Sequence, residues 1–137
     1  MFNQLSIYFA SDIDYAPRWR ALRDDPSWAH INFCSTWIDE PDLGIKEQDP
    51  DYMDKAWQRN LGDVTGADLL VCYVPLPAKG QGRFIETGAA LASFIPVLAV
   101  GTHFSSWTNH HLVMHCTTDE QMDAYLKKWL KGGGDSA

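Results

Sequence analysis

The chain has 137 residues, of which 45% are hydrophobic and 21% charged, and its formal net charge at pH 7 is −7. This length and composition are typical of one globular domain, and they exclude a disordered chain, a collagen and a disulfide-stabilised mini-protein. We therefore expect residues 1–137 to form a single domain, with residues 131–137 as a frayed tail.

Acidic residues are concentrated between positions 39 and 54, where seven carboxylates against Lys46 alone give 1 − 7 = −6. A surface that binds polynucleotides carries the opposite charge, so neither a nucleic acid nor an anionic membrane is expected as a partner. No apolar run approaches the roughly 18 residues that a membrane span needs. Three cysteines without paired spacing, and an N-terminus without a signal-peptide pattern, predict a cytoplasmic protein.

Strand and helix patterns alternate along the chain. We predict strands at 5–10, 31–34, 69–74, 96–100 and 111–115, and helices at 15–23, 51–64, 84–94 and 119–131. The acidic segment with Pro41, Gly44 and Pro50 is predicted to be a loop. The continuous apolar run 69–74 is typical of a central parallel strand, and Gly66 is placed to cap the helix before it.

This alternation predicts parallel βαβ units with right-handed crossovers, that is, an α/β fold. The simplest arrangement is a doubly wound, five-stranded, mainly parallel sheet with the strand order 2-1-3-4-5. Ligands of such sheets bind at the carboxyl ends of the strands, where the strand order reverses. The loops after Phe9, Val74 and Val100 are therefore expected to border the ligand crevice.

Two carboxylates near the central strand are candidates for chemistry. Glu86 follows the glycine-containing loop 75–83 and falls in the first turn of the predicted helix, where the helix dipole lowers a carboxyl pKa. An ionised carboxylate there can attack a substrate, although it could also only cap the helix. Asp63, late in the preceding helix, is either solvated or held by a partner. Asp68 is expected to be a turn residue away from the crevice.

The loop after the first strand and several aromatic residues are further candidates. The backbone amides and the Ser11 hydroxyl could cradle a hydroxyl or phosphate group, while Asp12 or Asp14 could be plain helix caps. Tyr8, Trp37 and Trp57 could stack on a flat ligand or pack in the core. No metal is expected, because the spacing of the histidines is not that of metal ligands: His103, His110, His111 and His115.

Four groups of segments occur in an order that is typical of one family: Ile7–Ser11; Ser35–Ile38; Asp63 with Asp68–Val71; and Gly82 with Glu86–Leu91 and Pro96–Val97. In this order they resemble the nucleoside 2-deoxyribosyltransferase family, which includes related 2′-deoxynucleoside 5′-monophosphate N-hydrolases. The resemblance covers about residues 5–131. It implies a flavodoxin-like fold, a homodimer or larger oligomer built from dimers, and cleavage of an N-glycosidic bond without a cofactor.

The resemblance also implies roles for single residues. Glu86 would be the nucleophile on the sugar C1′, and Asp63 would orient it or move a proton. Asn109 and His111 fall in the region from which family members reach into a neighbouring subunit's site. The predicted substrate-binding residues are Tyr8, Ser11, Asp12, Trp37, Gly82, Arg83, Asn109 and His111.

One departure from the family pattern affects the predicted substrate. Gly80 stands where transferases of the family often carry an aspartate for base recognition. Lys79, Gln81 and Arg83 instead give this loop positive charge and hydrogen-bond donors, which suits a 5′-phosphate. The sugar could be transferred to a second base or to water. The alternative is a non-catalytic module that binds or senses a nucleotide on the same fold.

Overall fold

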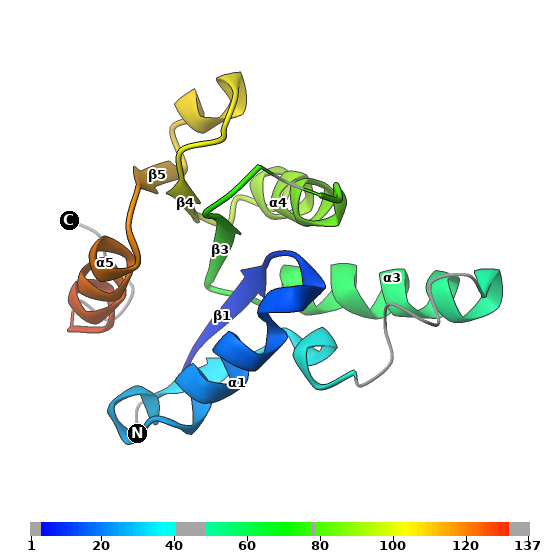
Figure 1. Ribbon diagram of the computed structural model, residues 1–137, viewed down its shortest axis with the longest axis horizontal. Helices are drawn as coiled ribbons and strands as arrows, with labels where there is room; N and C mark the ends of the chain where they lie inside the picture. The colour runs from blue at the N-terminus through cyan, green and yellow to red at the C-terminus, as the bar shows by residue number, and fades with distance from the viewer. Residues whose placement is uncertain (1–3, 41–48, 78, 132–137) are drawn as a thin grey trace.

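The computed structural model describes residues 4–40, 49–77 and 79–131. The strands are β1 (Leu5–Ala10), β2 (Ile31–Phe33), β3 (Leu69–Val74), β4 (Val97–Gly101) and β5 (Val113–Cys116) (Figure 1). The helices are α1 (Ala16–Asp24), α3 (Pro50–Thr65), α4 (Gly82–Ala92) and α5 (Asp119–Lys131). Short 3-10 helices cover Ile13–Tyr15, Pro26–Trp28, Thr36–Asp39 and Ser106–Asn109.

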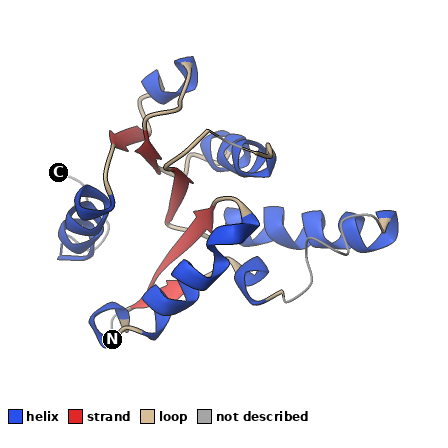
Figure 2. Ribbon diagram, in the orientation of Figure 1, coloured by secondary structure: helices blue, strands red, loops and turns tan. Residues whose placement is uncertain are grey.

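The five strands form one sheet in the order β2-β1-β3-β4-β5, and every neighbouring pair is parallel. Helices cover both faces, with α1 and α5 on one side and α3 and α4 on the other (Figure 2). Arg18 of α1 and Asp119 of α5 form an ion pair at 2.8 Å across the first of these layers. The doubly wound, flavodoxin-like α/β fold predicted from the sequence is confirmed.

The core lies on both faces of β1, β3 and β4. All six residues of β3 are buried, because this strand lies at the middle of the sheet between two helix layers. On β1, Phe9 stacks on Trp19 of α1 with ring centroids 4.5 Å apart and on Phe33 of β2 at 5.1 Å. These aromatic contacts fix α1 against the half of the sheet that carries β1 and β2.

Asp68 connects the start of β3 to β1. Its Oδ2 accepts a hydrogen bond from the amide of Ser6 at 2.8 Å, and the Asp68 amide donates to the Ser6 carbonyl at the same distance. These bonds lie at the amino end of the sheet, so the prediction that Asp68 is a turn residue away from the crevice is confirmed.

Several predicted boundaries move by one or two residues. Helix α4 begins at Gly82 rather than at position 84 and ends before Phe94, which has a positive φ of 61°. Strand β5 covers Val113–Cys116 rather than 111–115. Gly66 is the C-cap residue of α3, but at φ −90° it does not use the conformational freedom of glycine.

Parts of two predicted segments lie outside the described residues: positions 41–48 of the acidic segment and positions 132–137 of the predicted tail. Within the described part of the acidic segment, Asp39 ends a 3-10 helix, whereas Asp51 and Asp54 belong to α3, as the predicted helix at 51–64 requires. Among the described residues, no helix has the length and apolar character needed to cross a membrane.

We expect Gly101→Ala to destabilise the protein by at least about 2 kcal/mol. Gly101 ends β4 at φ 135°, and a Cβ on it would lie 1.8 Å from the carbonyl oxygen of Val74. Gly62→Ala in α3 is the control, because no atom lies within 4 Å of its added methyl group. This control should raise stability by up to about 1 kcal/mol. Equal unfolding midpoints in urea for the two variants would contradict the prediction.

Candidate active site

A cavity of about 480 Å³ opens at the carboxyl ends of β1 and β3. These strands are the pair at which the strand order reverses, which is where a ligand crevice was predicted. The lining comes from residues 11–14 after β1, from Trp37, from α3, from residues 79–83 after β3, and from Glu86. The loop after β4, which was also expected at the crevice, is not part of this lining.

Glu86 lies in the second turn of α4 and is only 5% exposed. The prediction of a first-turn carboxylate with a lowered pKa is therefore wrong, because α4 begins two residues earlier than expected. Burial raises the pKa of Glu86 to about 7, although the Tyr8 hydrogen bond and the Arg83 charge act to lower it. Near neutral pH the carboxyl group is thus divided between its ionised and neutral forms.

Tyr8 is completely buried in β1, and its hydroxyl donates a hydrogen bond to Oε2 of Glu86. Burial and the nearby Glu86 carboxylate raise the pKa of Tyr8 well above its ordinary value, so the phenol keeps its proton. Tyr8 is absent from the described cavity lining. Tyr8, which was predicted to bind substrate, therefore contacts the Glu86 carboxyl group and lies outside the described cavity lining.

Two ion pairs join the loops on either side of the cavity. The guanidinium group of Arg83, which is 2% exposed, pairs with Asp12, and Lys79 Nζ lies 3.4 Å from Oδ2 of Asp14. Neither aspartate uses its side chain to cap a helix. Arg83 therefore lines the cavity, but its charge is already opposed by the Asp12 carboxylate from the loop after β1.

Ser11 also lines the cavity. Its hydroxyl accepts a hydrogen bond from Nε1 of Trp19 at 2.9 Å and donates to the carbonyl of Asp12 at the same distance. Both bonds stay within the loop and the helix that follows it. The Ser11 hydroxyl therefore holds the loop to α1 in this arrangement.

Aromatic side chains also line the cavity. Trp37 is 4% exposed and donates from Nε1 to the carbonyl of Phe9 at 2.9 Å, so its ring is fixed in place. The ring of Trp57 lies against Gly82, where an added Cβ would be 3.1 Å from Cη2. Gly82 thus contributes to the site by allowing this close approach of Trp57.

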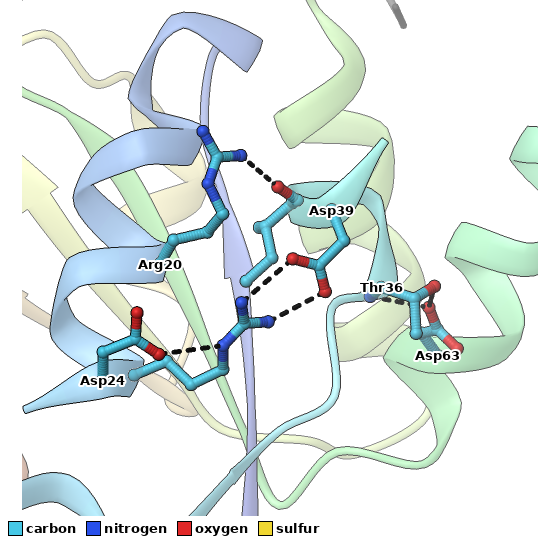
Figure 3. A network of polar contacts seen from close by, with 7 residues as sticks. Arg20, Asp24, Thr36, Asp39 and Asp63 are labelled. Carbon is cyan, nitrogen blue, oxygen red and sulfur yellow. Dashed lines mark hydrogen bonds and ion pairs between the residues drawn. The ribbon is translucent and has the colours of Figure 1, made fainter. Parts of the chain in front are cut away.

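Asp63 does not hydrogen bond to Glu86. Its Oδ2 accepts from the hydroxyl of Thr36 at 2.7 Å and from the Thr36 amide at 3.2 Å (Figure 3). The Asp63 charge nevertheless raises the pKa values of Glu86 and Tyr8. The sequence left open whether Asp63 is solvated or held by a partner, and the structure shows that Thr36 holds it. Asp63 acts on Glu86 only through its charge.

Two arginines of α1 hold the 3-10 helix that carries Trp37. Arg23 donates to both carboxylate oxygens of Asp39, at 2.8 and 3.0 Å, and Arg20 donates to the carbonyl of Ile38 at 2.6 Å (Figure 3). This network anchors one wall of the cavity to the first helix.

Asn109 and His111 lie after β4 and are exposed, outside the described cavity lining. Asn109 Nδ2 donates to the carbonyl of Ser106 at 3.1 Å, and the ring of His111 stacks on that of His110 at 4.6 Å. Their predicted place in a neighbouring subunit's site stays a prediction. Within the described residues, no group of three or more His, Cys, Asp or Glu side chains could hold a metal ion.

Two α3 residues of the cavity lining, Met53 and Asn60, were not among the site residues predicted from the sequence. Met53, Trp57 and Asn60 are spaced four and three residues apart, so they share one face of the helix. Asn60 is only 8% exposed. A polar residue on the otherwise apolar face of a predicted helix was the available signal.

No known family's sequence model matches the chain, and no curated protein matches it. Among solved structures, it is similar to the CMP N-glycosidase BcmB of Clostridium botulinum, with a TM-score of 0.56 and 14% sequence identity. The match covers 91% of this chain and 98% of the other. At this identity the likeness establishes the fold shared by the two chains.

We expect Glu86→Gln to stabilise the protein at pH 8 by up to roughly 3 kcal/mol and much less at pH 4.5. The pKa of Glu86 is raised from 4.5 to about 7, so the folded protein holds a proton that the unfolded chain releases between these pH values. Wild-type stability therefore falls as pH rises through this window, whereas glutamine has no proton to lose.

Urea unfolding at both pH values measures this difference. Glu120→Gln, the same change at an exposed position of α5, is the matched control and should show no such pH dependence. An effect of Glu86→Gln that is equal at pH 4.5 and pH 8 would show that the carboxyl group is not buried as described.

Proposed function

We propose that this protein cleaves the N-glycosidic bond of a nucleoside 5′-monophosphate, with Glu86 as the nucleophile on the sugar. The observation that carries the proposal is the buried Glu86 carboxyl group on the cavity lining, with one oxygen bound by Tyr8. The solved structure of similar fold is that of a CMP N-glycosidase, which supports this class of reaction. The resemblance found in the sequence favours a 2′-deoxyribose sugar.

The contacts of Glu86 agree with a covalent route. Tyr8 binds Oε2, which leaves Oε1 without a hydrogen bond from the described residues. Oε1 attacks C1′ as the bond from C1′ to the base nitrogen breaks, and the bonding electrons leave with the base, which takes up a proton. The positively charged sugar carbon of the transition state is stabilised by the adjacent carboxylate. Water then hydrolyses the glycosyl ester and restores Glu86.

The charged end of the cavity supports a phosphate on the substrate. Lys79 and Arg83 both line the cavity. Lys79 pairs with the carboxylate of Asp14, and Arg83 pairs with that of Asp12. A substrate phosphate would take over part of this pairing, since arginine and lysine bind phosphate through charge-assisted hydrogen bonds. A neutral nucleoside has no group to do so, and we therefore expect the monophosphate to be the better substrate.

We propose that water, and not a second base, accepts the sugar group. The loop after β3 carries no carboxylate that could recognise an incoming base. Gly80 occupies the position of the family's base-recognising aspartate, and its neighbours Lys79 and Gln81 are not acidic. A homodimer whose partner subunit contributes Asn109 or His111, and a cytoplasmic location, belong to the same proposal.

Purified protein should release free base from at least one nucleoside 5′-monophosphate, and Glu86→Gln should lower kcat by at least about a thousandfold. Chromatographic time courses over ribo- and deoxyribonucleotides and the parent nucleosides, each with and without a second free base, measure this. Glu120→Gln should keep full activity. Appearance of a new nucleoside would identify a transferase. Nucleotide binding without any turnover would contradict the proposed activity and identify a non-catalytic module that senses a nucleotide.

The value of kcat/KM should rise with pH, reach half of its maximum at about pH 7 and level off above roughly pH 8. The attacking form of Glu86 is the carboxylate, and its pKa of about 7 sets the midpoint of the rise. Arg83→Gln should move this midpoint upward, because the Arg83 charge lowers the pKa of Glu86. A profile that instead falls through pH 7 would identify Glu86 as a proton donor and not as the nucleophile.

A further inference from the structure

We infer that Asn60 selects the nucleobase, and that its side-chain NH₂ group donates a hydrogen bond to a carbonyl oxygen on the edge of the base. This inference rests on the proposed function and deepens it, because it names the class of base that the cavity accepts. It concerns the α3 residues of the cavity lining, which are distinct from the loop residues that are proposed to bind phosphate.

The α3 side of the cavity has the shape and chemistry that a flat, mostly apolar ring requires. Met53 and Trp57 lie one turn apart on the same helix face, and the buried ring of Trp37 adds a third apolar surface. Indole rings stack on nucleobases of every kind, so these side chains bind a base without distinguishing one from another. Discrimination needs a polar group that reaches the edge of the ring.

Asn60 is the polar group of α3 in this lining, and its orientation is set by its neighbour. Its Oδ1 accepts a hydrogen bond from Nη2 of Arg59 at 3.2 Å. A guanidinium group only donates hydrogen bonds, so the amide oxygen must turn toward Arg59 and the amide nitrogen away from it. Arg59 is itself held by an ion pair with Glu40, which keeps this orientation.

The amide nitrogen of Asn60 makes no hydrogen bond with the described residues, although the residue is only 8% exposed. Because Asn60 lines the cavity, this donor is available to a ligand there, in place of water. A base carbonyl supplies an acceptor at the ring edge. An exocyclic amine in the same place is also a hydrogen-bond donor. It would face the amide NH₂ group without an acceptor between them, which disfavours binding of bases that carry this amine.

Two pairs of bases test this inference, because their members differ at one exocyclic position. Uracil and hypoxanthine carry a carbonyl where cytosine and adenine carry an amine. We expect wild-type kcat/KM to favour the carbonyl member in at least one pair by about tenfold or more. Asn60→Asp, which replaces the donor by an acceptor of the same shape, should reverse that preference, and Asn60→Leu should bring the ratio within about threefold of one.

Gln58→Glu is the matched control. It adds the same negative charge to the same helix at an exposed residue outside the cavity lining, and it should leave the ratio unchanged. Circular dichroism and the urea midpoint establish that each variant is folded. If Asn60→Asp fails to fold, Asn60→Leu and Asn60→Ser carry the test, because each removes the amide without adding charge.

The outcomes separate this inference from the proposed function. Turnover with a base ratio that no Asn60 variant changes, or a wild-type preference for the amine in both pairs, overturns the role of Asn60 and leaves the proposed function in place. No turnover and no tryptophan fluorescence change with any nucleotide overturns both. A reversed ratio in Asn60→Asp with an unchanged ratio in Gln58→Glu supports the inference.

Discussion

Burial of one carboxyl group is the constraint on which the rest of the site depends. Glu86 is placed at the meeting point of β1, β3 and α4, where water is largely excluded. An ionised carboxylate is unfavourable there unless neighbouring groups compensate it. Tyr8 provides a hydrogen bond and Arg83 a positive charge, yet together they do not fully offset the burial, and the pKa remains near 7. Ionisation of Glu86 near neutral pH therefore lowers the stability of the folded protein.

The charged residues around Glu86 are also compensated by partners. Arg83 stabilises the carboxylate but is itself buried, so it in turn needs Asp12 from the loop after β1. Asp63 would destabilise Glu86 further if it were closer, and Thr36 holds it at a position from which it acts only through its field. Each of these charged side chains is thus paired with a group from another segment: α4 is joined to β1 and to the loop after it, and α3 is joined to the 3-10 helix.

The fold could be predicted because its signals are local and repeated. The apolar run of β3 and the amphipathic pattern of α5 gave the correct bounds of both elements, and the alternation of elements limits the topology to few choices. The start of α4 could not be predicted in the same way. Glycine has a low helix propensity, so Gly82 does not by itself indicate the start of a helix. The contact that its position permits is with the Trp57 ring, 25 residues earlier in the chain, and no local pattern reports such a contact.

The site was predictable in outline but not in its energetics. The position of Glu86 after the central strand placed it at the crevice, and the family resemblance supplied a role. The direction of its pKa shift depends on burial, which no local pattern reports, and a two-residue change in the start of α4 removed it from the first turn. Asn60 was overlooked for a related reason, since its importance depends on which helix face meets the cavity.

The pairing of β1 with β3 has a consequence for synthesis of the chain. Ile7 pairs with Leu69, and β2 reaches the sheet only through β1, so the first half of the sheet has no central strand until position 74 has left the ribosome. Contacts of such long sequence separation form late and slow folding. The emerging chain therefore carries the apolar segment of β1 unpaired on one edge for about half of its translation, and unpaired apolar strands of this kind are prone to aggregation.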